Sequence, residues 1–198
     1  EAKISIVTIE GRIKRLFSIR EKIRRQRLKL EEGYDLIALR AMTPPRAELT
    51  LPSPDATCAL AARLAPRLTP GDVLLLSGGI GAGKTHFARC LIQSLQEMPE
   101  DVPSPTFTLV QVYDTPAGEL WHADLYRLSD PDQCVELGLA DAFETAICLV
   151  EWPDRLADLA PAEALTLEFS AGPEDTERRI ILTGDPKRWA HLADRVPA

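Results

Sequence analysis

The sequence predicts an α/β fold, and three observations carry that prediction. A short apolar run at residues 73–76, bounded by turn residues, is typical of a buried strand. A glycine-rich segment follows it directly and leads into a helix with an apolar face at helical spacing. A second apolar strand at 146–150 comes later in the chain. Strand, glycine loop and helix in this order indicate an α/β fold organised around the loop.

The glycine-rich segment satisfies the pattern G-x-x-x-x-G-K-[ST] with the residues Gly78, Gly79, Ile80, Gly81, Ala82, Gly83, Lys84 and Thr85. Glycines let backbone N–H groups wrap closely around a polyphosphate, and the start of the next helix adds unpaired N–H groups. We expect Lys84 to bridge the β- and γ-phosphates and the Thr85 hydroxyl to bind Mg²⁺. The alternative is a glycine-rich turn that binds nothing, which the flanking strand and helix disfavour. The segment therefore predicts a nucleotide-binding protein.

The flanking elements follow from the same kind of pattern. The helix after the loop carries its apolar face on Phe87, Ala88, Leu91, Ile92 and Leu95. Ser53 is a plausible N-cap for an earlier helix that runs to Pro66. The expected strands are 48–51, 73–76, 108–114, 119–123, 146–150, 161–170 and 178–183. The remaining expected helices are 131–137, 139–143 and 185–196.

Composition places the chain among ordinary globular proteins. Of its 198 residues, 45% are hydrophobic and 27% charged, which suits one domain with a filled core. No apolar run has the length of a membrane span, and no signal peptide is apparent. Cys58, Cys90, Cys134 and Cys148 lie far apart without a C-x-x-C pair. We therefore expect buried thiols in a cytoplasmic protein, with neither disulfides nor a metal cluster and no membrane contact.

Charge divides the chain near residue 46. Residues 1–46 hold twelve Lys or Arg and six Asp or Glu, whereas residues 47–198 hold eleven and twenty-four. We expect 1–46 to be a basic extension and 47–198 to be the nucleotide-binding domain. Since an acidic body grips nucleic acid poorly, any contact with RNA is expected to run mainly through a partner.

Within the extension, residues 13–30 read as a basic amphipathic helix. This helix could be an arm that binds tRNA or a partner, although the composition favours a loosely ordered extension. A third interpretation makes Met42 the natural start, with the preceding residues lying upstream of it.

Three further segments carry candidate site residues. Ser104 and Thr106 lie in a proline-stiffened loop at 102–107, which could sense a γ-phosphate or could be a plain connector. Asp124 ends a strand, where a carboxylate near Mg²⁺ is needed, although a lone aspartate there could also cap a helix. Glu151 follows the strand at 146–150 and is a candidate to orient or deprotonate the attacking water.

Four pieces now line up in order: GGIGAGKT, SPTF, HADLYR and LVEWPDRL. Together they resemble the bacterial TsaE (YjeE) family of small ATPases needed to make threonylcarbamoyladenosine in tRNA. The resemblance covers residues 47–184 and implies a three-layer P-loop NTPase fold, with a mainly parallel central sheet plus antiparallel strands. It implies that ATP binds across residues 78–85, with Mg²⁺ near Thr85 and Asp124, and that Ser104 and Thr106 form a switch-like segment at the nucleotide. His86 could also reach a phosphate, although a solvated position on the helix surface is favoured.

The resemblance also implies roles and partners. It gives Lys84, Thr106 and Glu151 a part in hydrolysis. It implies that the chain acts with the TsaB–TsaD pair, which transfers the threonylcarbamoyl group, and that ATP use resets that complex between turnovers. Gly79 and His86 depart from the family pattern, which has aspartate at the first position and a threonine or another small or aliphatic residue at the second.

Two rival functions are disfavoured by what the chain lacks. A small-molecule kinase needs an arginine-bearing lid, and Arg127 is the only arginine between Asp124 and Glu151. A GTPase needs an [NT]-K-x-D motif, which does not occur in the sequence. A non-hydrolytic module, in which the nucleotide only gates docking, remains the non-enzyme alternative.

Overall fold

The computed structural model describes residues 46–185 and 188–189. The expectations for residues 1–45, including the basic helix and the role of Met42, lie outside the described residues. Most of the helix expected at 185–196 lies outside them too. Among the described residues, no helix is long and apolar enough to cross a membrane.

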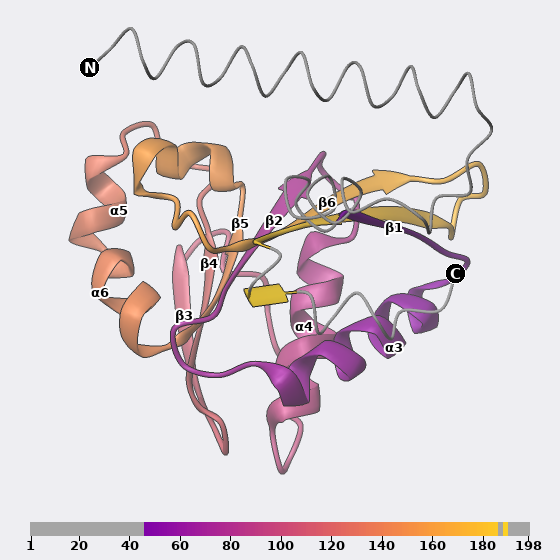
Figure 1. Cartoon of the computed structure of the whole chain (residues 1–198), viewed down its shortest axis with the longest axis horizontal. Helices are drawn as coiled ribbons and strands as arrows, with labels where there is room; N and C mark the ends of the chain where they lie inside the picture. The colour runs from indigo at the N-terminus through magenta and orange to yellow at the C-terminus, as the bar shows by residue number, and fades with distance from the viewer. Residues whose placement is uncertain (1–45, 186–187, 190–198) are drawn as a thin grey trace, which may run out of the picture. The chain divides into compact units, whose positions relative to one another are not determined.

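One mixed sheet of seven strands runs through the described part of the chain, in the order β1-β7-β6-β2-β5-β4-β3 (Figure 1). Its centre is parallel, because β2 pairs in parallel with β5 and β6, and β4 pairs in parallel with β5. Its two sides are antiparallel, through β1–β7 and β6–β7 on one side and β3–β4 on the other. The strands are β1 (Arg46–Leu51), β2 (Val73–Gly78), β3 (Val110–Thr115), β4 (Gly118–Asp124), β5 (Ile147–Glu151), β6 (Leu165–Ala171) and β7 (Arg178–Thr183).

Helices cover both faces of this sheet, so the described residues form three layers (Figure 1). One face is covered by α3 and α4, and the other by α5, α6 and the 3₁₀ segment η2. The helical elements are α3 (Pro54–Leu64), η1 (Ala65–Arg67), α4 (Lys84–Leu95), α5 (Asp132–Glu136), α6 (Leu139–Thr145) and η2 (Pro153–Leu159). The predicted α/β class and the predicted parallel centre with antiparallel strands are confirmed.

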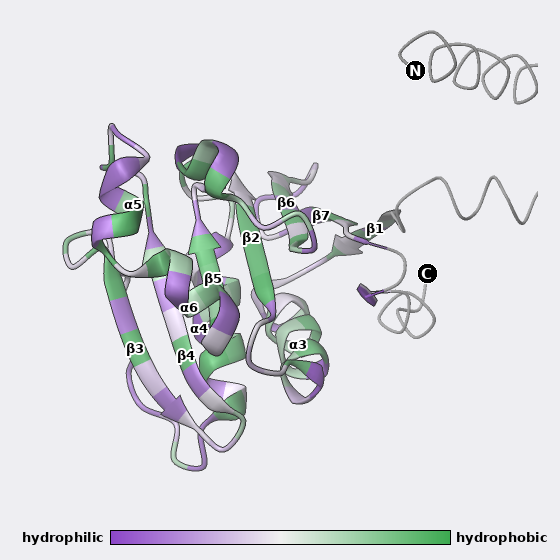
Figure 2. Ribbon diagram, turned by 60° about the vertical axis from the view of Figure 1, so that its left-hand side comes forward, coloured by the Kyte–Doolittle hydropathy of each residue, from purple (hydrophilic) through white to green (hydrophobic). Residues whose placement is uncertain are grey.

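The two central strands are apolar on both faces because each face has its own core. In β2, Leu74 and Leu76 pack with α3 and α4, whereas Val73 and Leu75 pack with α6 and η2. The same alternation divides β5 between the two cores. Figure 2 shows β2 and β5 as the hydrophobic centre of the sheet. A strand buried on both sides reads as a continuous apolar run, which is why the sequence reveals it.

Several predicted boundaries shift. The strand expected from Thr108 begins at Val110, because Leu109 has a left-handed φ of 66° and closes a turn onto Pro105 with an N···O distance of 2.7 Å. The loop at 102–107 is therefore less extended than expected. The strand expected from Pro161 begins at Leu165, after a turn in which the Ala164 N–H donates to the Pro161 carbonyl.

The prediction for the cysteines is correct for two of them and wrong for the other two. Cys134 and Cys148 are free and buried, and burial raises the pKa of the Cys148 thiol to about 12. Cys58 and Cys90 are joined in a disulfide, with their Cα atoms 5.0 Å apart. The sequence hides this proximity because the two residues are 32 apart and meet only when α3 packs on α4.

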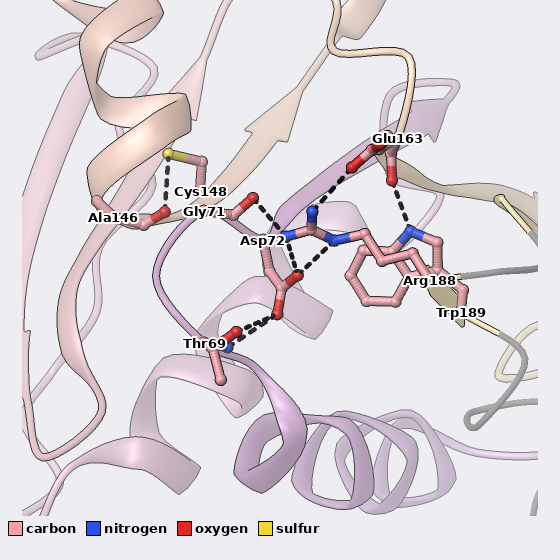
Figure 3. A network of polar contacts seen from close by, with 8 residues as sticks. All are labelled: Thr69, Gly71, Asp72, Ala146, Cys148, Glu163, Arg188 and Trp189. Carbon is pink, nitrogen blue, oxygen red and sulfur yellow. Dashed lines mark hydrogen bonds and ion pairs between the residues drawn. The ribbon is translucent and has the colours of Figure 1, made fainter.

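A polar network fastens the C-terminal segment to the start of β2 (Figure 3). The Arg188 guanidinium donates to Asp72 Oδ1 from Nε and Nη2, at 2.9 and 2.7 Å, and also to the Gly71 carbonyl and to Glu163. Asp72 Oδ2 accepts from the backbone N–H and the hydroxyl of Thr69. The hydrogen bond to Asp72 is the main cause that raises the pKa of Arg188. Asp72 is buried, so these donors replace the water that would otherwise solvate its carboxylate.

We predict that Asp72→Ala lowers the free energy of unfolding by about 1.5–3 kcal/mol, because charge-assisted hydrogen bonds to a buried carboxylate are lost. Chemical denaturation measures this change. Glu48→Ala is the matched control, since Glu48 pairs with Arg179 on the surface, where both side chains are about half exposed. That variant should change stability by less than ~0.5 kcal/mol. Equal losses in the two variants would contradict the role of the Asp72 network.

Candidate nucleotide-binding site

The glycine loop connects the end of β2 to the start of α4. Gly78 has a φ of 128° and Gly83 a φ of 109°, values that side-chain-bearing residues rarely adopt. At Gly78 there is also no room, because a Cβ would lie 2.3 Å from the Phe169 carbonyl oxygen of the neighbouring strand β6. At Gly79 and Gly81, a Cβ would meet nothing within 4 Å. The loop therefore has no free space at Gly78, where it leaves β2, and has open space at Gly79 and Gly81. A loop that surrounds phosphate groups requires such open space.

Lys84 begins α4 and turns its side chain back over the loop. Its ammonium donates to the carbonyls of Gly78 and Gly79, each at 2.8 Å. The same nitrogen lies 4.0 Å from the centroid of the Trp152 ring, within cation–π range. Lys84 is 4% exposed, and this desolvation lowers its pKa, while the negative charges of Glu151 and Asp124 oppose the shift. A buried cation held by neutral carbonyls is well suited to meet an anionic ligand.

The two candidate carboxylates lie side by side because of strand register. Asp124 at the end of β4 pairs with Glu151 at the end of β5, and Glu151 pairs with Leu76 of β2. Parallel strands end at the same edge of a sheet, so both carboxylates reach the edge from which the glycine loop emerges. Both are buried, at 4% and 2% exposure.

Glu151 joins the helix start to a histidine that sequence reasoning missed. Its Oε2 accepts from the Thr85 hydroxyl at 2.9 Å, and its Oε1 lies 3.0 Å from Nε2 of His122. His122 is fully buried, and its Nδ1 has no hydrogen-bond partner among the described residues. The available signal was spacing, since His122 is two residues before Asp124 and so shares its face of β4.

The proline-flanked loop meets the other carboxylate. Thr106 donates its hydroxyl to Asp124 Oδ2 at 2.8 Å, and Ser104 lies 2.8 Å from the Thr106 oxygen. The backbone N–H of Tyr126 donates to Asp124 Oδ1 at 3.0 Å. Asp124 is thus connected to Ser104 and Thr106, while Glu151 is connected to Thr85.

The donor set suits a hard cation. Hydroxyl and carboxylate oxygens of Thr85, Thr106, Asp124 and Glu151 are the kind of ligand that Mg²⁺ accepts. The polyphosphate of a nucleotide would be held by the loop backbone and Lys84, with a metal at the hydroxyl and carboxylate oxygens. The described residues therefore fit both groups chemically.

His86 points elsewhere. Its Nε2 lies 3.1 Å from the Pro54 carbonyl and 3.5 Å from Cys58 Sγ, so the ring faces α3. The structure does not bring this ring together with Thr85, Asp124 and Glu151. The expectation that His86 is a solvated surface residue also needs revision, because the half-buried ring has specific neighbours.

A strand, a G-x-x-x-x-G-K-[ST] loop and a helix, with acidic residues at the ends of the adjacent strands, define a P-loop nucleotide-binding protein. Comparison with known proteins narrows the class. Residues 51–180 match the family model described as threonylcarbamoyl adenosine biosynthesis protein TsaE, and the chain belongs to the TsaE family. Proteins of this family take part in the biosynthesis of threonylcarbamoyladenosine in tRNA.

Individual relatives agree with this assignment. The TsaE protein of Bacillus subtilis is 35% identical over 145 residues, which cover 73% of this chain and 89% of that protein. The TsaE protein of Rickettsia bellii is 34% identical over 129 residues, covering 65% of this chain and 90% of its own length. The crystal structure of Bacillus subtilis YdiB matches with a TM-score of 0.65 and 31% identity, covering 76% of this chain and 93% of that one. The predicted family and P-loop fold are confirmed.

We predict that Gly78→Ala destabilises the protein in the absence of nucleotide by about 1–3 kcal/mol, the cost of a sparsely populated backbone conformation. The contact with the Phe169 carbonyl would add to this cost. Gly79→Ala is the control, since Gly79 has open space and is not among the positive-φ glycines. Thermal unfolding compares the two variants. A Gly78→Ala protein as stable as the Gly79→Ala protein would contradict this description of the loop.

Proposed function

We propose that this chain is an ATPase that binds ATP with Mg²⁺ and hydrolyses it in support of threonylcarbamoyladenosine synthesis. The observation that carries the proposal is the convergence of Lys84, Thr85, Asp124 and Glu151 at one sheet edge, beside a loop with an open rim. ATP is proposed to lie across residues 78–85. His86 belongs to the first turn of α4 beside the nucleotide, but its ring is not proposed to contact ATP.

Each side chain has a distinct part in the proposed hydrolysis. Lys84 exchanges its two carbonyl partners for phosphate oxygens and stabilises the charge that develops on them. The Thr85 hydroxyl and Asp124 would hold Mg²⁺, which would neutralise charge on the phosphates. Glu151 orients the attacking water and accepts its proton. His122 is a positioning residue, because its contact with Oε1 fixes the Glu151 carboxylate.

The loop that holds Ser104 and Thr106 is proposed to respond to the nucleotide. The Thr106 hydroxyl is bonded to Asp124, so any movement of that carboxylate toward a metal changes the position of the loop. Phe107, the next residue, is 85% exposed, and Ile80 on the glycine loop is 80% exposed. Contiguous exposed apolar patches mark protein–protein contacts, and we propose that Ile80 and Phe107 contribute to such a patch.

These exposed side chains support docking to the TsaB–TsaD pair, with tRNA contacted mainly through that pair. ATP hydrolysis is then proposed to reset the transferase complex between turnovers, in the cytoplasm. The small-molecule kinase is disfavoured because Arg127, the one arginine between Asp124 and Glu151, stacks on Phe107, with its guanidinium 5.4 Å from the ring centroid. The non-hydrolytic module differs from our proposal only in turnover, which can be measured.

We predict that Glu151→Gln retains ATP affinity but lowers the hydrolysis rate by about 10²-fold or more, since the amide cannot accept the proton of water. Glutamine keeps the size of the side chain, which limits structural damage. Single-turnover hydrolysis and equilibrium nucleotide binding separate the two effects. Glu144→Gln, at an exposed position on α6, is the control and should hydrolyse ATP at the unsubstituted rate. An unchanged rate in Glu151→Gln would remove the catalytic assignment.

The proposed role in modification predicts a difference between single and multiple turnover. A reconstituted assay contains the TsaB–TsaD pair, threonylcarbamoyl-adenylate, tRNA and ATP. The intact chain should sustain many rounds of modification, whereas Lys84→Ala should not, because it lacks the cation that holds the phosphates. If Lys84→Ala is folded and equally effective, the chain acts only by binding. If neither protein has an effect, the proposed reset function fails.

A further inference from the structure

We propose that Cys58, His86 and Cys90, in their reduced form, bind a thiophilic divalent cation of the Zn²⁺ class at a site separate from the nucleotide site. The three residues come from two helices, since Cys58 lies on α3 while His86 and Cys90 lie four residues apart on one face of α4. This proposal does not depend on the ATPase activity proposed above.

The spacing of the ligand atoms supports a common metal. Nε2 of His86 lies 3.5 Å from Cys58 Sγ and 3.8 Å from Cys90 Sγ, and the three atoms lie within 4.8 Å of one another. A tetrahedral Zn²⁺ with bonds of about 2.3 Å to sulfur and about 2.0–2.1 Å to nitrogen needs N···S separations of about 3.6 Å. These distances hold while Cys58 and Cys90 are joined in the disulfide, and in that state the imidazole nitrogen is already close to the required distance from both sulfurs. Reduction must then separate the two sulfurs before both can bind one ion.

The donor types select the metal. Two thiolates and one imidazole favour Zn²⁺ and similar ions over Mg²⁺, which prefers oxygen ligands. Three protein ligands leave the fourth tetrahedral position to water. Cys58 and His86 are half-buried, so an ion can reach the cluster from solvent. The free cysteines Cys134 and Cys148 are both buried, and neither belongs to a comparable group of ligands among the described residues.

The disulfide between Cys58 and Cys90 is the alternative state of the same site. Two equivalents of a thiol reductant convert it to two cysteine thiols, and the reductant is oxidised to its own disulfide. Metal binding then displaces the two thiol protons, and the sulfurs become thiolate ligands. The neutral His86 ring must present Nε2 as a lone pair, so its proton lies on Nδ1 and its contact with the Pro54 carbonyl is given up.

Either state connects α3 to the first turns of the helix that carries the glycine-loop lysine. His86 follows Thr85 directly, so a metal at this cluster fixes the start of α4 against α3. Because the metal binds the folded arrangement, it is expected to raise the unfolding temperature of the reduced protein.

Cobalt(II) titration of the full reduced chain tests the proposal, because thiolate-bound tetrahedral Co²⁺ has charge-transfer and intense d–d absorption bands. Excess Mg²⁺ is present throughout to occupy oxygen-ligand sites. We expect one equivalent of Co²⁺ to produce the thiolate bands and Zn²⁺ to displace it. Cys58→Ser and Cys90→Ser should each lose the two-thiolate spectrum. His86→Ala should bind Co²⁺ at least ~10-fold more weakly, because loss of a ligand costs no less than loss of a residue that only orients a ligand.

Cys134→Ser is the matched control and should keep the full spectrum, because Cys134 lies on α5 in the core on the opposite face of the sheet from Cys90. A thiol titration of the denatured protein should count four free thiols after reduction and two before it, since all four cysteines lie in the described part of the chain. The proposal is overturned if the reduced protein gives no thiolate bands, or if Cys58→Ser and Cys90→Ser both retain them. A disulfide that persists in the folded protein under reducing conditions would contradict it as well.

Discussion

The parallel register of β4, β5 and β2 is the constraint on which the candidate site depends. It places Asp124 beside Glu151, and it places Glu151 beside Leu76. Leu76 lies two residues before Gly78, the first residue of the glycine loop. A shift of one residue in either pairing would turn a carboxylate to the other face of the sheet. The two hydrophobic cores oppose such a shift, because the alternate residues of β2 and β5 are committed to opposite faces.

The electrostatics of the site follow from this arrangement. Lys84, Asp124 and Glu151 are all buried, and none of them is directly ion-paired with another in the described residues. Lys84 is bonded to carbonyls, Asp124 to a hydroxyl and a backbone N–H, and Glu151 to a hydroxyl and His122. The charged side chains of Lys84, Asp124 and Glu151 are therefore hydrogen-bonded to carbonyl, hydroxyl, backbone N–H and imidazole groups, which can exchange these bonds for bonds to a ligand. Such an arrangement can accept a nucleotide and a metal without first breaking a strong salt bridge.

Local signals explain what the sequence could predict. The apolar runs of β2 and β5, the glycine pattern and the Ser53 cap each depend on a few neighbouring residues, and each was confirmed. Lys84 and Thr85 followed from the glycine-loop pattern. Asp124 and Glu151 followed from their places at the ends of strands, where ligands bind.

Contacts between distant segments could not be predicted in the same way. The pairing of Thr85 with Glu151 joins residues 66 apart, and the pairing of Thr106 with Asp124 depends on how a proline-flanked loop folds back. In the sequence His122 is only one polar residue within a predicted strand, and its contact with Glu151 is apparent only in the structure. Cys58 and Cys90 illustrate the same limit, since only the packing of α3 on α4 brings them together.

The central claim is that one sheet edge assembles a site for a nucleotide and its metal. The most direct measurement is the anomalous scattering of Mn²⁺ in crystals grown with a non-hydrolysable ATP analogue. Our account predicts a single Mn²⁺ peak bonded to the Thr85 hydroxyl and close to Asp124 or Glu151, with the phosphates wrapped by residues 78–85. A nucleotide bound away from this loop, or a metal that contacts neither Thr85 nor the two carboxylates, would contradict it.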